Sequence, residues 1–456
     1  MRRVVKVSRI RIIITIIVVV LTTLLTGCTG KEPNEIAYVV TLGIDSTDDD
    51  NYKITIQYAN TTQISGGASE SGGKAGSEIV DNVTIEAPNI YAGVGLANNI
   101  VSKSFSMSHA KLIVFSKEIA EKGVKDMIET LVRSEEIRPD VFIAVANTTA
   151  NDYLTSVNPE MEVNPAQYYQ LIYQKNQLVG IPDGQLREFF TGLYTDNYDS
   201  ILPVAGVIEG SGGNSQNDDK GQSKDGQNEG SEGSSESLDS FESKSSNEKD
   251  ENEKEKDAEK NTSKYEYDIK NYIGGETTIE KKNKAEAIGA AVFEKDKMVG
   301  ELGEVETEIC KMLKGDYTYS YLTYYNNDTP DIPITVKTTQ QKKPKYKIDT
   351  DKKTVDIELY IESDLYSLPA DYNVENKIED FERDVANYTS SACTEFINNF
   401  TKKYNSDILK LNEKVKYKFL TNNQYNWFKK NVGWSEYKFS VCTNFKVRRT
   451  GLMVRE

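Results

Sequence analysis

The last long alternating run of the chain reads Tyr437-Lys438-Phe439-Ser440-Val441-Cys442-Thr443-Asn444-Phe445-Lys446-Val447. Every second residue, starting from Tyr437, is aromatic or β-branched, and the residues between them are mostly polar. Successive side chains of a strand point to opposite faces of a sheet. The run therefore predicts one long strand that buries a single face.

A long helix is expected before this strand. Residues 374–404 carry apolar side chains at three- and four-residue steps, which is typical of an amphipathic helix of about 30 residues. These apolar positions are Ile378, Phe381, Val385, Ala392, Phe396 and Phe400. Further patterns predict a hairpin around 290–300, a short helix at 304–313 and strands at 317–324, 332–337, 346–349 and 355–361. One long helix among antiparallel strands predicts an α+β domain over residues 285–456.

The chain changes character from residue 210 to about residue 261. Between residues 211 and 260 the apolar residues are Leu238, Phe241 and Ala258, and the acidic residues outnumber the basic ones by eight. Such a segment cannot bury enough apolar surface to offset its conformational entropy, so we expect it to be disordered. It is either a linker or a long insertion in a small middle domain over residues 201–284, and the sequence leaves both open.

Residues 28–200 are expected to form an N-terminal domain of mixed α/β type. Strand patterns occur at 36–44, 52–58, 83–85, 111–115 and 141–146, and another follows at 201–208. Helical patterns lie between them at 89–103, 119–132, 165–178 and 185–193. The whole chain is therefore predicted to be a multi-domain α+β protein.

The N-terminus has the layout of an export signal. Five basic residues precede a 14-residue apolar run from Ile12 to Leu25, which is too short to span roughly 30 Å of hydrocarbon comfortably. The run ends in Leu25-Thr26-Gly27-Cys28, which resembles the bacterial lipobox. That resemblance implies that residues 1–27 are a lipoprotein signal peptide and that Cys28 carries diacylglycerol. The alternative is an ordinary signal peptide, or a retained anchor, with an incidental cysteine.

Charge and cysteine content narrow the class of protein. The formal net charge is −16, and removal of the basic leader makes it more negative, which argues against nucleic-acid binding. If Cys28 is lipidated, Cys310, Cys393 and Cys442 remain, and three cysteines cannot all pair within one chain. Their spacing fits neither a zinc knuckle nor a Cys-x-x-Cys redox pair. We expect Cys310 and Cys393 to be small buried hydrophobic residues.

The sequence contains few candidates for catalysis. His109 is the only histidine, so it would have to serve any Ser-His-Asp triad, yet no Gly-x-Ser-x-Gly motif accompanies it. Glu135 and Glu136 are adjacent, and adjacent residues point apart on a helix, so a solvated helix end is the better interpretation. No phosphate-binding glycine motif is present. We predict no enzyme, with no catalytic, cofactor-binding or metal-binding residues.

Tyrosine is the other unusual feature, with 27 residues in the chain. Tyr168, Tyr169 and Tyr173 cluster on one predicted helix. Two interpretations are open for this cluster: a face that recognises carbohydrate or peptide, or ordinary half-buried packing, which we favour.

Five further segments follow one another along the chain. They are a Glu-Ile…Gly-Ile-Asp opening from Asn34 to Asp45, a Ser-His-x-Lys strand from Ser108 to Phe115, an Arg-x-x-Glu-Ile-Arg helix end from Leu131 to Pro139, a Gly-x-Ala-Val-Phe hairpin from Gly289 to Gly300, and Arg448-Arg449-Thr450-Gly451 after the last strand. Taken in this order, the segments resemble the Ger(x)C lipoproteins, the C-subunits of spore germinant receptors. The family commonly has Trp-Asp after the lipid-bearing cysteine, where this chain has Thr29-Gly30.

The resemblance implies three domains, no enzymatic activity and partnership with two integral membrane subunits in a complex that starts nutrient-triggered germination. It implies a location at the outer face of the spore inner membrane, held by the lipid on Cys28. A different class of protein, a lipoprotein that binds a solute and delivers it to a transporter, is the main alternative. Such proteins have two similar lobes, whereas the C-terminal region here is rich in strands. An envelope enzyme is a weaker alternative.

Overall fold

The computed structural model describes residues 13–17, 35–49, 51–59, 80–158, 165–174, 180–195, 197–208, 271–277, 283–325, 333–367, 377–404 and 406–449. The predicted lipid-bearing Cys28 and the acidic segment at 210–261 lie outside these residues, so both remain predictions. None of the helices in the described ranges combines the length and the apolar character needed to span a bilayer.

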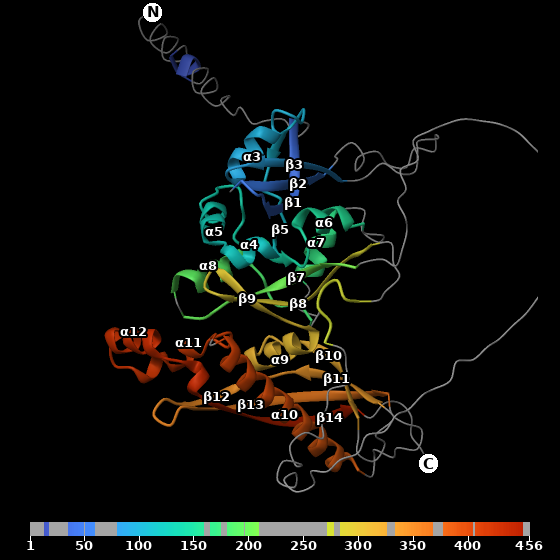
Figure 1. Cartoon of the computed structure of the whole chain (residues 1–456), viewed down its shortest axis with the longest axis vertical. Helices are drawn as coiled ribbons and strands as arrows, with labels where there is room; N and C mark the ends of the chain where they lie inside the picture. Colours follow the sequence, from blue (N-terminus) through green and yellow to red (C-terminus); the bar gives the residue numbers. More distant parts are fainter. Residues whose placement is uncertain are drawn as a thin grey trace, which may run out of the picture. The chain divides into compact units, whose positions relative to one another are not determined.

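A nine-stranded mixed sheet forms the N-terminal part of the fold (Figure 1). Its strand order is β3-β2-β1-β5-β6-β7-β8-β9, and β4 pairs with β1. The pairs β1–β4, β1–β5, β5–β6 and β6–β7 are parallel, and the other pairs are antiparallel. The strands are β1 (Ile36–Ser46), β2 (Tyr52–Ala59), β3 (Val80–Ala87), β4 (Ser104–Ser106), β5 (Leu112–Ser116), β6 (Phe142–Ala146), β7 (Ile201–Val207), β8 (Ala285–Glu294) and β9 (Lys297–Leu302).

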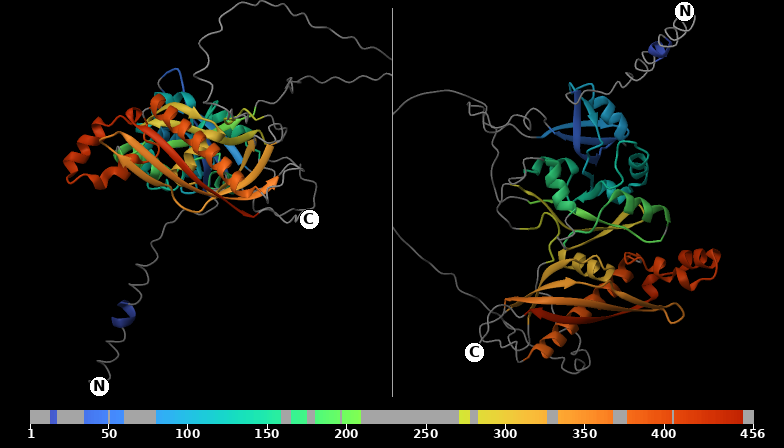
Figure 2. Two further views of the ribbon diagram at one scale, coloured as in Figure 1. Left: turned by 90° about the horizontal axis from the view of Figure 1, so that it is seen from below. Right: turned by 180° about the vertical axis from the view of Figure 1, so that it is seen from behind.

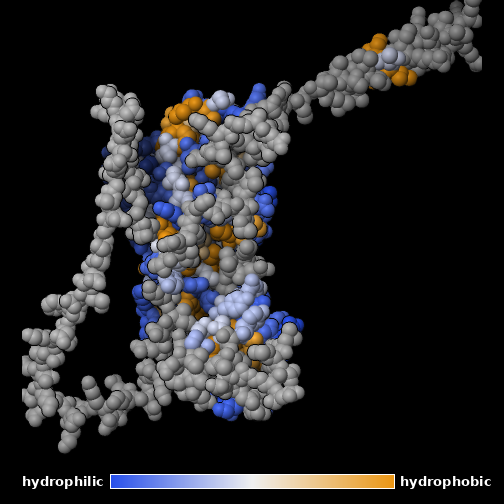
Figure 3. Space-filling view, turned by 90° about the vertical axis from the view of Figure 1, so that its right-hand side faces the viewer, coloured by the Kyte–Doolittle hydropathy of each residue, from blue (hydrophilic) through white to orange (hydrophobic). Residues whose placement is uncertain are grey.

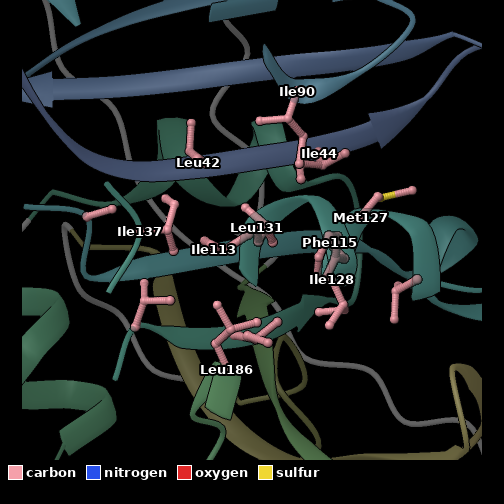
Figure 4. Packing of buried hydrophobic residues seen from close by; sticks show 14 of the residues in the cluster. Leu42, Ile44, Ile90, Ile113, Phe115, Met127, Ile128, Leu131, Ile137 and Leu186 are labelled. Atoms are coloured by element: carbon pink, nitrogen blue, oxygen red, sulfur yellow. The ribbon is translucent and has the colours of Figure 1, made fainter. Parts of the chain in front are cut away.

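Helices cover both faces of this sheet. On β5, Ile113 and Phe115 belong to one hydrophobic cluster, and Leu112 and Val114 belong to another, as strand alternation requires. The first cluster also takes in residues from α3 (Ile90–Ala97), α4 (Lys117–Lys122), α5 (Lys125–Val132) and α8 (Leu186–Thr195), several of which are labelled in Figure 4. The second takes in residues from α6 (Ala150–Ser156) and α7 (Pro165–Gln174). The central strands are therefore apolar on both sides.

One predicted helix is divided in two. The pattern over 119–132 predicts a continuous helix, but α4 ends at Lys122 and α5 begins at Lys125. Gly123 between them has φ of 126°, a conformation that side chains with a Cβ rarely adopt. The N–H of Val124 then donates to the carbonyl of Asp296, so the break ties the helices to the β8–β9 hairpin.

The C-terminal part is a five-stranded sheet of order β10-β11-β13-β12, with β14 beside β13. Its long helix α10 (Ile378–Tyr404) lies along β14, and Cys393, Phe396 and Ile397 pack in one cluster with Val355 and Ile357 (Figures 1 and 2). The other elements are α9 (Glu304–Lys314), β10 (Tyr319–Tyr325), β11 (Pro333–Gln340), β12 (Lys345–Asp349), β13 (Thr354–Ser367), α11 (Leu411–Val415), the 3-10 turns η2 (Lys416–Lys418) and η3 (Trp434–Glu436), α12 (Asn422–Asn431) and β14 (Lys438–Arg449).

The expected antiparallel sheet needs one correction. Four strands pair antiparallel, but β14 runs parallel to β13. A parallel neighbour needs a crossover connection, and α10, α11 and α12 between the two strands supply it. The fold class is α+β, as predicted, with a mixed N-terminal sheet and one long helix on the C-terminal sheet.

The described residues form one compact unit. Strand β7 pairs antiparallel with β8, with Val207 opposite Ala285, so the chain leaves and re-enters the sheet at neighbouring positions. The predicted domain boundaries at residues 200 and 284 therefore fall beside two strands of the same sheet, and an independent middle domain stays a prediction. Where Figure 3 draws described residues, hydrophilic side chains lie along both sides of the face, with separate hydrophobic areas between them.

Candidate functional site

The Gly43-Ile44-Asp45 segment at the end of β1 holds the start of α6. The buried Asp45 carboxylate accepts hydrogen bonds from the backbone N–H of Ala150 (2.6 Å) and of Asn151 (3.0 Å). Burial raises the pKa of Asp45, while these two hydrogen bonds act in the opposite direction. Gly43 lies so close to α6 that an added Cβ would come within 2.9 Å of the Leu154 side chain. This segment is a structural joint between β1 and α6.

The Ser-His-x-Lys and Glu-Ile-Arg segments meet at one corner of the first sheet. Glu136 accepts a hydrogen bond from the backbone N–H of Met107 at 2.7 Å. His109 is exposed, its Nδ1 lies 3.0 Å from Ser108 Oγ, and its ring meets the edge of Tyr38 with centroids 4.8 Å apart. Glu136 thus has a structural contact, and the contacts of His109 are those of a surface residue beside the start of a strand.

The tyrosine cluster lies in the core rather than on a recognition face. Tyr168, Tyr169 and Tyr173 of α7 are buried together with Tyr153 of α6. The Tyr153 and Tyr173 hydroxyls are 3.0 Å apart, and Tyr169 donates to Gln57 Oε1 at 2.8 Å. Burial raises the pKa of Tyr153 and of Tyr169 well above the usual value. The packing interpretation of these tyrosines is therefore confirmed.

The cysteines and the buried charges of α9 are also structural. Cys310 and Cys393 are buried and unpaired, and burial raises their pKa values to about 11 and about 12, so they are poor nucleophiles. Lys311 Nζ donates to the carbonyl of Ile181 at 2.9 Å, and burial lowers its pKa to about 8. Among the residues that the structure describes, no group of three or more His, Cys, Asp or Glu side chains could hold a metal ion.

A cavity of about 490 Å³ lies where α8 and the hairpin of β8 and β9 meet α11 and α12. At its wall Asp199 accepts from the backbone N–H of Asp407 (2.8 Å) and of Lys295 (3.4 Å). Asp407 in turn accepts from the N–H of Leu411 (2.7 Å) and of Asn412 (2.8 Å). The lining residues are Gly192, Tyr198, Asp199, Glu294, Lys295, Asp407, Asn412, Asn426, Lys429, Lys430, Val432 and Trp434.

Burial dominates the electrostatics of this cavity. It raises the pKa of Asp407 to about 7, against the lowering effect of its two backbone hydrogen bonds and of Lys414. Lys429 Nζ donates to the carbonyl of Thr195 (2.9 Å) and to Asn197 Oδ1 (3.0 Å), which ties α12 to the end of α8. The charged groups of the wall therefore serve mainly to hold its elements together.

Two buried polar atoms at the cavity wall have no hydrogen-bond partner among the described residues: Asn412 Oδ1 and Trp434 Nε1. Their residues are 7% and 2% exposed. One can accept and the other can donate a hydrogen bond, so the cavity could hold a small polar molecule. Sequence reasoning missed this site because its residues are spread from 192 to 434 and form no motif.

Two family models match the chain. Residues 30–207 match the N-terminal domain of spore germination proteins, and residues 288–451 match the spore germination B3/GerAC-like C-terminal domain. The chain resembles spore germination protein KC of Bacillus subtilis (strain 168), at 28% identity over 32% of this chain and 40% of that protein. It also resembles the putative spore germination protein YfkR of the same strain, at 28% identity over 32% of this chain and 37% of that protein.

A third relative is spore germination protein GerQC of Bacillus cereus, at 27% identity over 23% of this chain and 29% of that protein. The chain thus spans less than half the length of each of these relatives. The crystal structure of the GerBC protein aligns with a TM-score of 0.48 and 14% identity, covering 89% of this chain and 96% of that one. On the two domain matches, which together cover most of its residues, the chain belongs to the Ger(x)C family of spore germination proteins.

Proposed function

We propose that this chain is the lipid-anchored, non-enzymatic C-subunit of a spore germinant receptor. It takes part in nutrient-triggered germination, held at the outer face of the spore inner membrane by diacylglycerol on Cys28. Its partners are the integral membrane subunits of the receptor. The observation that carries the anchor is Leu25-Thr26-Gly27-Cys28 at the end of a 14-residue apolar run. Family membership supports the role in germination.

A diacylglycerol anchor is sufficient for stable membrane binding because it carries two acyl chains. Each buried methylene contributes about 0.8 kcal/mol, so a single chain binds a bilayer only marginally and two chains hold firmly. A protein anchored in this way needs no spanning helix of its own. Its folded part can then present surfaces to membrane-embedded subunits at the bilayer.

A scaffold role agrees with how the polar residues are used. Three carboxylates accept hydrogen bonds from backbone N–H groups: those of Asp45, Glu136 and Asp407. A general acid or base needs its proton-transferring atom free to meet a substrate. These contacts support a rigid binding protein in preference to an enzyme.

One observation favours a second candidate, a lipoprotein that binds a solute for a transporter. The cavity of about 490 Å³ has the size of a small-molecule site, and Asn412 Oδ1 and Trp434 Nε1 of its lining residues have no hydrogen-bond partner in the described part of the chain. The two sheets seen in the described residues have nine and five strands and different orders, unlike the two similar lobes of transporter-associated binding proteins. The receptor role is therefore the better supported.

Two experiments test the proposal. Metabolic labelling with a palmitate analogue should tag the wild-type chain and fail on Cys28→Ala. Cys442→Ala is the matched control, because Cys442 is an exposed cysteine that should have no part in labelling. Affinity purification from the spore inner membrane should recover integral membrane receptor subunits. Labelling of Cys28→Ala would end the anchor proposal, and recovery of transporter subunits instead would favour the second candidate.

A further inference from the structure

The segment from residue 410 to residue 431, which contains α11, η2 and α12, exposes large apolar side chains. Leu420 is 95% exposed, Tyr417 is 79% exposed and Trp427 is 68% exposed. Leu420 and Tyr417 are the two most exposed large hydrophobic residues in the described part of the chain. Soluble surfaces tolerate single exposed apolar residues, but three on one short segment indicate an interaction surface.

The segment holds these side chains outward because others of its residues pack inward. Phe419 stacks on Phe428 with ring centroids 4.9 Å apart, and Phe428 meets Trp434 at 6.1 Å. Tyr425 and Phe428 are three residues apart on α12 and share its inner side, whereas Trp427 lies on the exposed side. Thr421 caps the start of α12 by accepting from the N–H of Gln424. An ordered segment therefore holds Tyr417, Leu420 and Trp427 on its exposed side.

The same segment is basic in an otherwise acidic chain. Residues 410–430 contain six lysines and one glutamate, whereas the whole chain has a net charge of −16. Lys410 Nζ lies 3.9 Å from the Glu188 carboxylate. Lys414 is half-buried beside Asp407, whereas Lys416, Lys418 and Lys430 are exposed. Lys416 lies over the Tyr425 ring, and Lys418 donates to the carbonyl of Ile348.

We propose that this segment docks on an anionic phospholipid surface, with Leu420 and Trp427 entering the headgroup region and the lysines facing the phosphates. Tryptophan and tyrosine favour the membrane–water interface, and lysines add attraction to anionic lipid. Charge complementarity favours lipid over the chain's own acidic surface as the occupant, because an anionic membrane offers apolar depth beside the negative charge. Figures 1 and 2 place α12 at the periphery of the fold.

This docking would add a second, weaker contact to any lipid anchor, and it goes beyond the proposed function because it does not depend on Cys28. The test therefore uses the chain from Thr29 onward, which carries no lipid and keeps residues 35–449. Its partition onto vesicles of phosphatidylglycerol and phosphatidylcholine is compared with its partition onto phosphatidylcholine alone. We expect binding to the anionic vesicles that falls at high salt, because salt screens the lysine attraction.

The double variant Leu420→Asp/Trp427→Asp should bind the anionic vesicles at least about tenfold more weakly, since it loses the apolar contact. Both positions are exposed, so the fold should be retained, and equal melting temperatures verify this. Ile100→Asp, at a 69% exposed position on another part of the surface, is the matched control and should bind like the parent chain.

The tryptophans give an independent readout, because the chain contains two of them. In the variant Trp434→Phe, Trp427 is the tryptophan that remains, so the fluorescence comes from it. On anionic vesicles its emission should shift to the blue and be quenched by brominated acyl chains. The proposal is overturned by equal binding to neutral vesicles, by equal loss in Ile100→Asp, or by an unquenched Trp427. It is also overturned if the parent chain does not bind the vesicles. A loss of self-association or of a protein partner in the double variant would then identify the occupant of this surface instead.

Discussion

Asp199 and Asp407 are joined by two hydrogen bonds although they lie 208 positions apart in sequence. The N–H of Asp407 donates to Asp199 Oδ2 at 2.8 Å, and the N–H of Asp199 donates to the carbonyl of Asp407 at 3.1 Å. One residue belongs to the segment matched by the N-terminal family model and the other to the segment matched by the C-terminal one. This pair therefore links the two halves of the family fold.

Asp407 should make stability depend on pH. Burial raises its folded-state pKa to about 7 from an ordinary 3.8, so between these values folding takes up a proton. The contribution of this carboxyl to the free energy of unfolding is complete below about pH 4 and falls as the pH rises to about 7. At about 1.4 kcal/mol per pH unit, the loss is on the order of 4 kcal/mol.

Asp407→Asn removes that titration. Urea unfolding of both proteins at about pH 4.5, 6 and 7.5 should show the stability difference, wild type minus variant, shrinking as the pH rises. A difference that grows with pH would show that the hydrogen bonds from Leu411 and Asn412 outweigh burial and keep the carboxylate charged.

Asp45→Ala should destabilise the fold by about 2 kcal/mol, because loss of a helix-capping carboxylate typically costs 0.5–2 kcal/mol and leaves two N–H groups of α6 without a partner. Asp48→Ala, at an exposed position in the turn after β1, is the control and should change stability by less than about 0.5 kcal/mol. The measurement is urea unfolding followed by circular dichroism. Equal effects of the two substitutions would refute the capping role.

Deletion of residues 211–260 should leave the fold intact and change the melting temperature by less than about 2 °C, a shift that corresponds to roughly 1 kcal/mol in a fold of this size. The reason is that Val207 pairs with Ala285 and the N–H of Ile208 donates to the carbonyl of Lys284 at 2.9 Å, so the described strands on either side of the segment are joined directly to each other. Differential scanning fluorimetry of the two proteins checks this. A deletion variant that fails to fold would show that the acidic segment is part of the structure.

His109→Asn should leave spore germination within about threefold of the wild-type rate at equal protein level. His109 is exposed and contacts Ser108 and Tyr38, whereas loss of a general base typically costs a hundredfold or more. Glu136→Ala, in the same corner, should lower stability more because Met107 N–H loses its acceptor. Germination is timed in spores whose protein level is matched by immunoblot. A hundredfold loss in normally assembled His109→Asn would contradict the non-enzymatic proposal.

Local pattern was sufficient for the elements that bury one regular face. The alternation from Tyr437 to Val447 became β14, and the three- and four-residue steps after residue 374 became α10. The pattern at 111–115 predicted β5 within a residue at each end. These predictions succeeded because burial of one strand or helix face is encoded by neighbours in sequence.

Short elements held by distant partners could not be predicted in this way. Helix α6 has seven residues and depends on Asp45, which lies more than a hundred positions earlier. Helix α12 buries Tyr425 but few other side chains, so it has little periodicity to detect. The net charge of −16 also hid the basic segment at 410–430, because a sum over the chain averages out a local excess.

The sequence by itself determined the α+β class, the long helix, the family and the candidate lipid site at Cys28, since each depends on residues close together in the chain. Only the tertiary structure decided the parallel pairing of β14, the cavity beside Asp199 and Asp407, and the outward set of Leu420 and Trp427. These features arise where segments far apart in sequence meet. Their physical cause is long-range packing, which determines both the partner of each buried polar group and the side chains that are left facing the solvent.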